Sequence, residues 1–173
     1  MFQLGINFLF LLIAFLLQNT AGVYFKIGVV VPDITLVTLI CIAFIEGQLP
    51  ATAAGFIAGL LKDLVSIRGF GVNALTHTLI GFLAGSFETG FITSSFILMG
   101  IVAIATLVGQ LFYVGIAFML NYQIDYLFWR YALLADIYNA LISPLIYLAV
   151  NIFYQKVLNR KQVVELKDGQ KKA

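Results

Sequence analysis

Apolar residues follow one another in long, unbroken stretches along this chain, and short segments with glycine or polar residues separate the stretches. A membrane-spanning strand shows about ten residues of alternating polarity. A membrane-spanning helix instead needs about 20 mostly apolar residues in a row. The continuous stretches therefore predict helices, and we expect six of them, at about residues 4–23, 29–46, 49–65, 71–88, 92–121 and 128–155.

The composition indicates where these helices lie. Of the 173 residues, 62% are hydrophobic and only 10% are charged, whereas a soluble domain is about 45–50% apolar and about 25% charged. A globule of this size has too little interior to bury so much apolar surface. The sequence therefore predicts an all-α integral membrane protein, a bundle of six transmembrane helices. Because no Lys or Arg precedes Lys26, the first stretch lacks the basic start of a signal peptide, and we expect it to be retained as a helix.

Residues 156–173 form a basic tail after the last predicted helix, with Lys156, Arg160, Lys161, Lys167, Lys171 and Lys172. Cytoplasmic flanks of membrane helices are enriched in Lys and Arg. We therefore expect the tail in the cytoplasm, and six spans place the N-terminus there too. The tail either sets orientation and attracts anionic lipids, at about 1 kcal/mol per basic residue, or serves as a docking segment for a cytoplasmic partner.

Two stripes of small residues predict a close pair of helices. Gly55 and Gly59 lie four residues apart in the third predicted helix, and Gly81 and Gly85 lie four residues apart in the fourth. Residues four apart are neighbours on a helix surface. Small residues allow membrane helices to approach closely, so that dispersion and weak hydrogen bonds hold them together. We expect the two helices to pack as an antiparallel hairpin, with Lys62 and Arg68 at its tip reaching the lipid headgroups.

Polar residues near several predicted helix ends form a candidate cluster. Chain direction alternates from one helix to the next, so these ends lie on one side of the membrane, the outer side in the predicted topology. Polar groups at membrane depth usually face the protein interior. The cluster is a hydrogen-bonded staple between helices, a partner-binding groove, or a pocket for a small molecule or ion. Its members are Asp33, Asp63, Asn73, His77, Asp136 and Asn139. His77 alone is expected to be structural rather than a proton relay.

Catalytic and metal-binding patterns are absent from the sequence. No GxSxG, HExxH or GxxxxGK[ST] motif occurs. The single cysteine, Cys41, lies in an apolar run and cannot form an internal disulfide or a Cys/His metal site. Basic stripes with interleaved aromatic residues, typical of nucleic-acid binding, are also missing. We therefore expect no enzyme, no cofactor, no metal and no nucleic-acid partner.

Residues 29–88 resemble the central region of the MreD family, the bacterial rod shape-determining membrane proteins. The matching features are Pro32-Asp33 at a helix entry, a small-residue run over 51–59 that leads into LLKD at 60–63, GVNAL at 71–75 and GFLAG at 81–85. His77 is not part of the family's pattern. The other predicted helices match in hydrophobicity and placement.

The resemblance implies a non-enzymatic scaffold of the cell-elongation machinery in the bacterial cytoplasmic membrane. Such a scaffold binds MreC, a single-span protein, and acts alongside MreB, the glycosyltransferase RodA and a class B penicillin-binding protein. It would help to regulate cell shape and lateral peptidoglycan synthesis. The family is also similar in fold to the S-components of energy-coupling-factor transporters. The alternative function is therefore a substrate-binding membrane subunit of a small-molecule, vitamin-type transporter, with the polar cluster lining its pocket.

Overall fold

The computed structural model describes residues 2–20, 22, 24, 26–28, 30–66, 70–87, 94–121, 123–125 and 127–172, with side chains from residue 5 to residue 156. The described residues form six helices and no strand, which confirms the all-helical prediction. Residues Ile27 and Val30 make an isolated bridge before the second helix. The helices are α1 (Phe2–Thr20), α2 (Ile34–Glu46), α3 (Gln48–Val65), α4 (Val72–Ala84), α5 (Ser95–Met119) and α6 (Phe128–Lys172).

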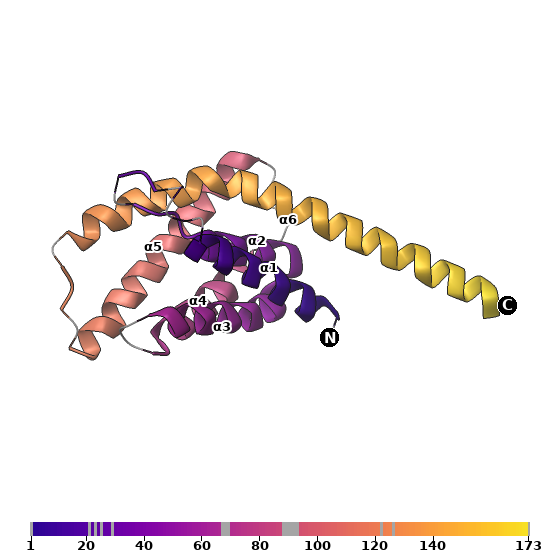
Figure 1. Cartoon of the computed structure of the whole chain (residues 1–173), viewed down its shortest axis with the longest axis horizontal. Helices are drawn as coiled ribbons and strands as arrows, with labels where there is room; N and C mark the ends of the chain where they lie inside the picture. Colours follow the sequence, from indigo (N-terminus) through magenta and orange to yellow (C-terminus); the bar gives the residue numbers. More distant parts are fainter. Residues whose placement is uncertain are drawn as a thin grey trace.

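Helix α2 is the centre of the bundle. Its sequence, ITLVTLICIAFIE, is apolar except for two threonines and the final glutamate, and residues 35–44 are all buried. A helix that is apolar all round is stable where other helices cover it on every face. Helices α1, α3, α4, α5 and α6 all contact α2, and Figure 1 shows α1 to α4 gathered together with α5 and α6 alongside.

Two helices have bounds that differ clearly from the predicted ones. Helix α2 begins at Ile34 rather than near residue 29, because Asp33 caps it and accepts a hydrogen bond from the backbone N–H of Leu36 at 3.0 Å. Helix α6 continues to Lys172 rather than ending near residue 155. The segment after residue 155 contains mainly Lys, Gln, Leu, Val, Arg and Glu, of which all but Val are good helix formers. Figure 1 shows α6 extending well past the rest of the bundle.

The other four helices begin or end within a few residues of the predicted positions. Helix α1 ends at Thr20, and α4 ends at Ala84, where the backbone N–H of Gly85 donates to Gly81 at 3.0 Å. The predicted ends of these helices at residues 23 and 88, and the predicted start of the fifth helix at residue 92, lie outside the described residues.

The helices differ in whether they are long and apolar enough to cross a membrane. Residues Ser95–Met119 and Phe128–Lys156 are long and apolar enough to cross a membrane. Helices α2 and α4 have 13 residues each, about 20 Å at 1.5 Å per residue. A typical hydrocarbon core is about 30 Å thick. Each of these two helices is therefore shorter than a typical hydrocarbon core is thick.

Helices α3 and α4 pack backbone against backbone. A Cβ atom added at Gly55, Gly59, Gly81 or Gly85 would lie closer than 3.0 Å to a backbone atom of the opposite helix or its N-terminal cap. Real Cβ atoms essentially never approach so closely, so no larger side chain fits without a shift of the helices. The structure thus places all four glycines of the two predicted stripes at one helix contact.

Candidate functional site

Asp63, at the end of α3, holds the start of α4. Its carboxylate accepts hydrogen bonds from the backbone N–H groups of Gly71 at 2.9 Å, Asn73 at 3.1 Å and Ala74 at 3.0 Å, and from the Asn73 side chain at 3.0 Å. These N–H groups belong to the first turn of α4 and its cap, where no carbonyl within the helix is available. Gly71 has φ +95°, which favours glycine. Asp63 therefore fastens the tip of the α3–α4 hairpin.

Asp33 connects three helices at the same end of the bundle. Its side chain caps α2 and also pairs with the ammonium group of Lys62 on α3. Its backbone N–H donates to the side-chain oxygen of Asn139 on α6 at 2.7 Å. Lys62 was expected to reach the lipid headgroups, and the structure shows instead that it turns inward to this carboxylate. Arg68 lies outside the described residues.

Asp136 belongs to a separate contact between α5 and α6. The side-chain amide nitrogen of Gln110 donates to Asp136 at 2.7 Å and to the backbone carbonyl of Ala132 at 3.2 Å. The Gln110 amide is therefore oriented with its nitrogen toward α6. Its carbonyl oxygen then points elsewhere, and it is buried without a hydrogen-bond partner.

His77 also leaves one buried atom without a partner. Its Nδ1 lies 2.9 Å from the backbone carbonyl oxygen of Asn73, and a carbonyl oxygen can only accept, so Nδ1 carries the hydrogen. In a neutral ring, Nε2 is then an acceptor. His77 is 3% exposed, and its Nε2 and the Gln110 oxygen are the two buried side-chain atoms that lack a partner within the described part of the chain.

Both unpartnered residues line one polar cavity of about 260 Å³. Of the six predicted cluster residues, Asp33, Asn73, His77 and Asn139 line this cavity, together with Lys62 and Gln110. Asp63 lies behind Asn73, and Asp136 lies behind Gln110, so neither of them lines it. The structure therefore divides the predicted cluster into a cavity wall and two supporting carboxylates.

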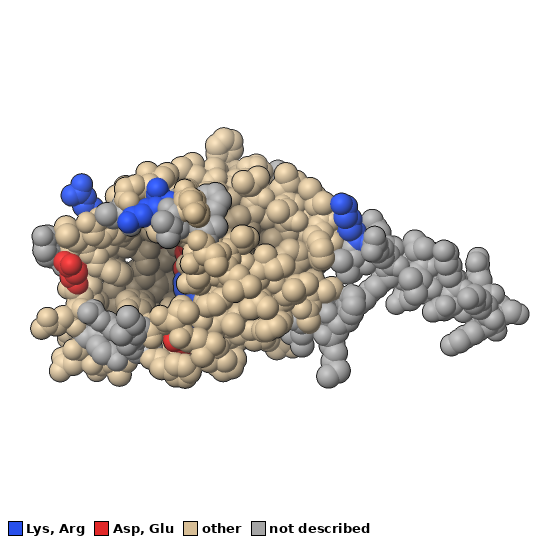
Figure 2. Space-filling view, viewed as in Figure 1, with Lys and Arg blue, Asp and Glu red and all other residues tan. Residues whose placement is uncertain are grey.

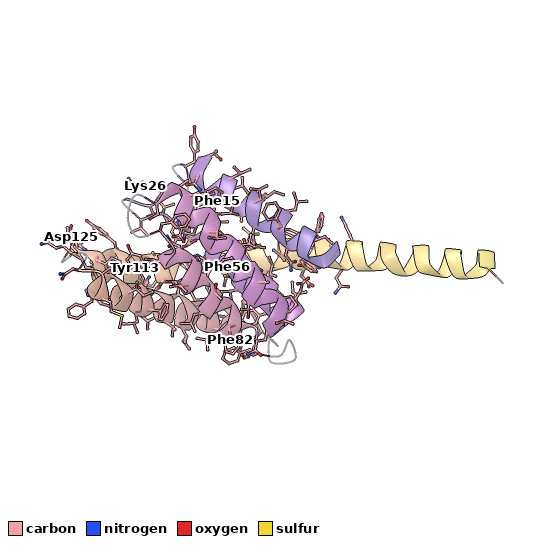
Figure 3. All side chains as sticks on the ribbon, turned by 90° about the horizontal axis from the view of Figure 1, so that it is seen from below. Phe15, Lys26, Phe56, Phe82, Tyr113 and Asp125 are labelled. Carbon is pink, nitrogen blue, oxygen red and sulfur yellow. The ribbon has the colours of Figure 1, made fainter. Side chains whose placement is uncertain are left out.

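A larger hollow of about 470 Å³ adjoins the cavity, and Gln110, Tyr113 and Phe128 line both. Asp125 lines the outer hollow. Figure 2 shows the molecule hollowed near α5 and the start of α6, with charged atoms visible inside. Figure 3 shows Tyr113 and Asp125 at the end of the molecule away from the projecting part of α6. The cavity is thus reached from one end of the bundle.

A second polar cluster, at the opposite end of α2, was not predicted. The side chains of Asn7 on α1 and Tyr154 on α6 both hydrogen-bond to Glu46, at the end of α2, and to each other. Asn7 is 1% exposed and Tyr154 is 3% exposed. One feature of the sequence could have predicted this cluster: Asn7 is a polar residue inside the apolar run GINFLFLLIAFLL.

An apolar groove of about 350 Å³ lies between α4 and α5. Nine residues line it: Ile80, Leu83, Ala84, Ser86, Phe87, Ile101, Ile104, Ala105 and Val108. Ala84 and Ala105 are small residues between larger ones. Leu83, Phe87 and Ile104 are exposed large apolar residues at this surface.

These features define a small, all-helical membrane protein whose buried polar contacts tie the ends of its helices together. A family model for the rod shape-determining protein MreD matches residues 1–157, nearly the whole chain, and the chain belongs to that family. The family functions in rod shape determination and is associated with the MreC/MreB machinery. No curated protein and no solved structure matches the chain, so the expected likeness to transporter S-components finds no support here.

Proposed function

We propose that this protein is a non-enzymatic, multi-pass scaffold of the cytoplasmic membrane that binds the transmembrane helix of an MreC-like single-span protein. Through that partner it helps to regulate cell shape and lateral peptidoglycan synthesis, alongside MreB, RodA and a class B penicillin-binding protein. Membership of the MreD family supports the role in rod shape. The α4–α5 groove is the observation that carries the binding mechanism.

The groove has the features of a membrane helix contact. Lipid tails are as apolar as leucine, so helices in a membrane associate through close packing rather than through the hydrophobic effect. Ala105 provides a low point where another backbone can approach, and Leu83 and Ile104 are exposed beside it. The side chains of a partner helix can fill the groove between these residues. They pack there more closely than the lipid chains that they replace.

The proposed topology places both termini in the cytoplasm and the basic tail against anionic lipids. Helix α2 then begins at the outer side, where Asp33 and Lys62 pair, and ends near the inner side at Glu46. The polar cavity faces the extracytoplasmic side in this orientation.

A groove-filling variant tests the proposal. Ala105→Phe adds a ring inside the groove, whereas Ala103→Phe adds the same ring to the same helix, at a residue of similar partial exposure that does not line the groove. Each full-length protein is purified from native membranes in mild detergent, and co-purified proteins are identified and quantified by mass spectrometry.

We expect the wild-type protein and Ala103→Phe to recover an MreC-like single-span protein at near-stoichiometric yield, and Ala105→Phe to recover several-fold less. Equal recovery with all three proteins would contradict the groove mechanism. Recovery of an ATPase module in place of the single-span protein would contradict the scaffold and favour the transporter subunit.

A further inference from the structure

The α4–α5 groove occupies one half of the bundle rather than its whole length. On α4 its lining residues begin at Ile80 and continue past the end of the helix to Phe87, and on α5 they lie between Ile101 and Val108. Both helices are described along their whole length, and no residue of α4 before Ile80 and none of α5 after Val108 lines the groove. The groove therefore lies beside the last part of α4 and the first part of α5.

Direct contact between α4 and α5 closes the groove at one end. A Cβ atom added at Gly109, the residue after Val108, would lie 2.5 Å from the Ile80 side chain. Ile80 is 2% exposed and Gly109 is buried, so the Ile80 side chain fills the space that the glycine leaves free. The two helices touch at this point, and the groove lies on one side of it.

Hydrogen bonds show which end of the bundle the groove occupies. Ser86, in the groove lining, accepts a hydrogen bond at 2.7 Å from the side chain of Gln48, the first residue of α3. Gln48 lies two residues after Glu46, which bonds to Tyr154 on α6. Tyr154 comes just before the part of α6 that extends past the rest of the bundle (Figure 1). The groove therefore lies at the end from which α6 projects, the cytoplasmic end in the proposed topology.

The length of the groove limits how much of a partner helix it holds. From Ile101 to Val108, α5 rises by seven residues, or about 10 Å at 1.5 Å per residue. A helix that crosses the membrane spans a hydrocarbon core of about 30 Å. The groove therefore holds about two turns of a partner helix, roughly a third of its membrane-spanning length.

The lining restricts the side chains that the partner presents. Ser86 is the one polar residue in it, and its hydroxyl group already accepts from Gln48 and donates to the backbone carbonyl of Phe82 at 2.9 Å. A polar side chain of the partner would lose its hydrogen bonds on entering such a groove, which is unfavourable. Small side chains would leave a hollow of about 350 Å³ partly empty and forfeit packing contacts.

We infer that the groove binds only about two turns of the partner's transmembrane helix, those nearest the cytoplasm, and that these turns present large apolar side chains. The inference rests on the proposed function, because it concerns how the same partner occupies the same groove. The extracytoplasmic part of the partner helix does not follow α5 past Gly109. Recognition of the partner by the groove then depends on the cytoplasm-proximal part of its span.

Photo-crosslinking at two residues of α5 tests how far the partner follows this helix. Ile104 and Leu111 lie seven residues apart on one face of α5 and are 64% and 52% exposed, but only Ile104 lines the groove. Each is replaced in the full-length protein by a photoreactive aliphatic residue of similar size, and crosslinking is carried out in native membranes. We expect residue 104 to crosslink to the cytoplasm-proximal part of the span of an MreC-like protein, and residue 111 to give several-fold less of that crosslink.

The crosslinks separate failure of this inference from failure of the proposed function. Equal yields of partner crosslink from residues 104 and 111 would overturn the inference and leave the proposed function standing, because the partner would then follow the whole of α5. A crosslink from residue 104 to the extracytoplasmic part of the span would do the same. If neither residue crosslinks to a single-span protein, or if residue 104 crosslinks only to lipid, both the inference and the proposed function are overturned.

Alanine replacements in the partner test the side-chain chemistry without any change to this protein. Seven consecutive residues in the cytoplasm-proximal part of the partner's span become alanine in one variant, and seven in the extracytoplasmic part become alanine in the matched control. Alanine keeps the helix and removes the large side chains. With equal amounts of partner in the membrane, we expect the first variant to co-purify several-fold less well and the control to co-purify normally. Equal recovery of both, or a greater loss with the control, would overturn the inference.

Discussion

Substitution of Gly59 by alanine tests the backbone contact between α3 and α4. A Cβ atom at residue 59 would lie closer than 3.0 Å to the backbone of Asn73 and Ala74. Backbone atoms cannot rotate away as a flexible side chain can. The two residues also sit in the first turn of α4, where Asp63 already fixes their N–H groups. The helices therefore have to separate for the methyl group to fit.

The expected magnitude follows from two opposing effects. Extra carbon in a packed core costs typically about 1–3 kcal/mol, and the rigid neighbours place Gly59→Ala toward the upper end. Alanine is favoured over glycine in a helix by about 1 kcal/mol, which offsets part of the loss. The net destabilisation is about 1–2 kcal/mol, or roughly 2–8 °C in melting temperature for a chain of this size.

Gly100→Ala is the matched control, because a Cβ atom at Gly100, inside α5, meets nothing within 4 Å. We expect this control to keep or slightly raise the melting temperature, measured for both variants by fluorescence-detected size-exclusion chromatography after heating in one detergent. An unchanged melting temperature for Gly59→Ala, or an equal fall for Gly100→Ala, would refute the close-contact reasoning.

Three further substitutions test the polar contacts, each by the same melting assay. Asp63→Ala removes the acceptor for four hydrogen bonds, and with N–H groups of the α4 start left unpaired we expect a loss of about 2–3 kcal/mol; an unchanged melting temperature would show that Asp63 does not fasten the hairpin. Lys62→Met leaves the Asp33 carboxylate unpaired, so the double variant with Asp33→Asn should be more stable than Lys62→Met alone; equal or lower stability of the double variant would deny that the ion pair matters. Tyr154→Phe removes a hydroxyl that bonds Asn7 and Glu46, and we expect a loss of about 1 kcal/mol that becomes smaller in an Asn7→Leu background, where only the bond to Glu46 remains to be lost; full additivity of the two changes would contradict the cluster.

The helices and the α3–α4 contact were predictable because both depend on local pattern. Continuous apolar runs indicate membrane helices whatever their neighbours, and glycines four residues apart mark one face of a helix. Pro32-Asp33 also indicates that α2 begins late. The predicted helix nevertheless began near residue 29, because the residues just before Pro32 are hydrophobic, and those of them that the structure describes form no helix.

Contacts between distant residues were not predictable in the same way. Lys62 and Asp33 are 29 residues apart, and nothing in either local sequence shows that the lysine turns inward. Asn7 and Tyr154 are 147 residues apart. Asp136 does not line the cavity because the Gln110 side chain lies between them. The orientation of that side chain depends on how α5 packs against α6, which the sequence does not show.

Photo-crosslinking inside native membranes tests the central claim most directly, namely that a partner helix occupies the α4–α5 groove. A photoreactive residue at Ile104, in the groove, is compared with one at Phe56, an exposed apolar residue of α3 that does not line it. We expect residue 104 to crosslink to an MreC-like single-span protein and residue 56 to give no protein crosslink. A crosslink of equal yield from both positions, or one from residue 56 alone, would contradict the account.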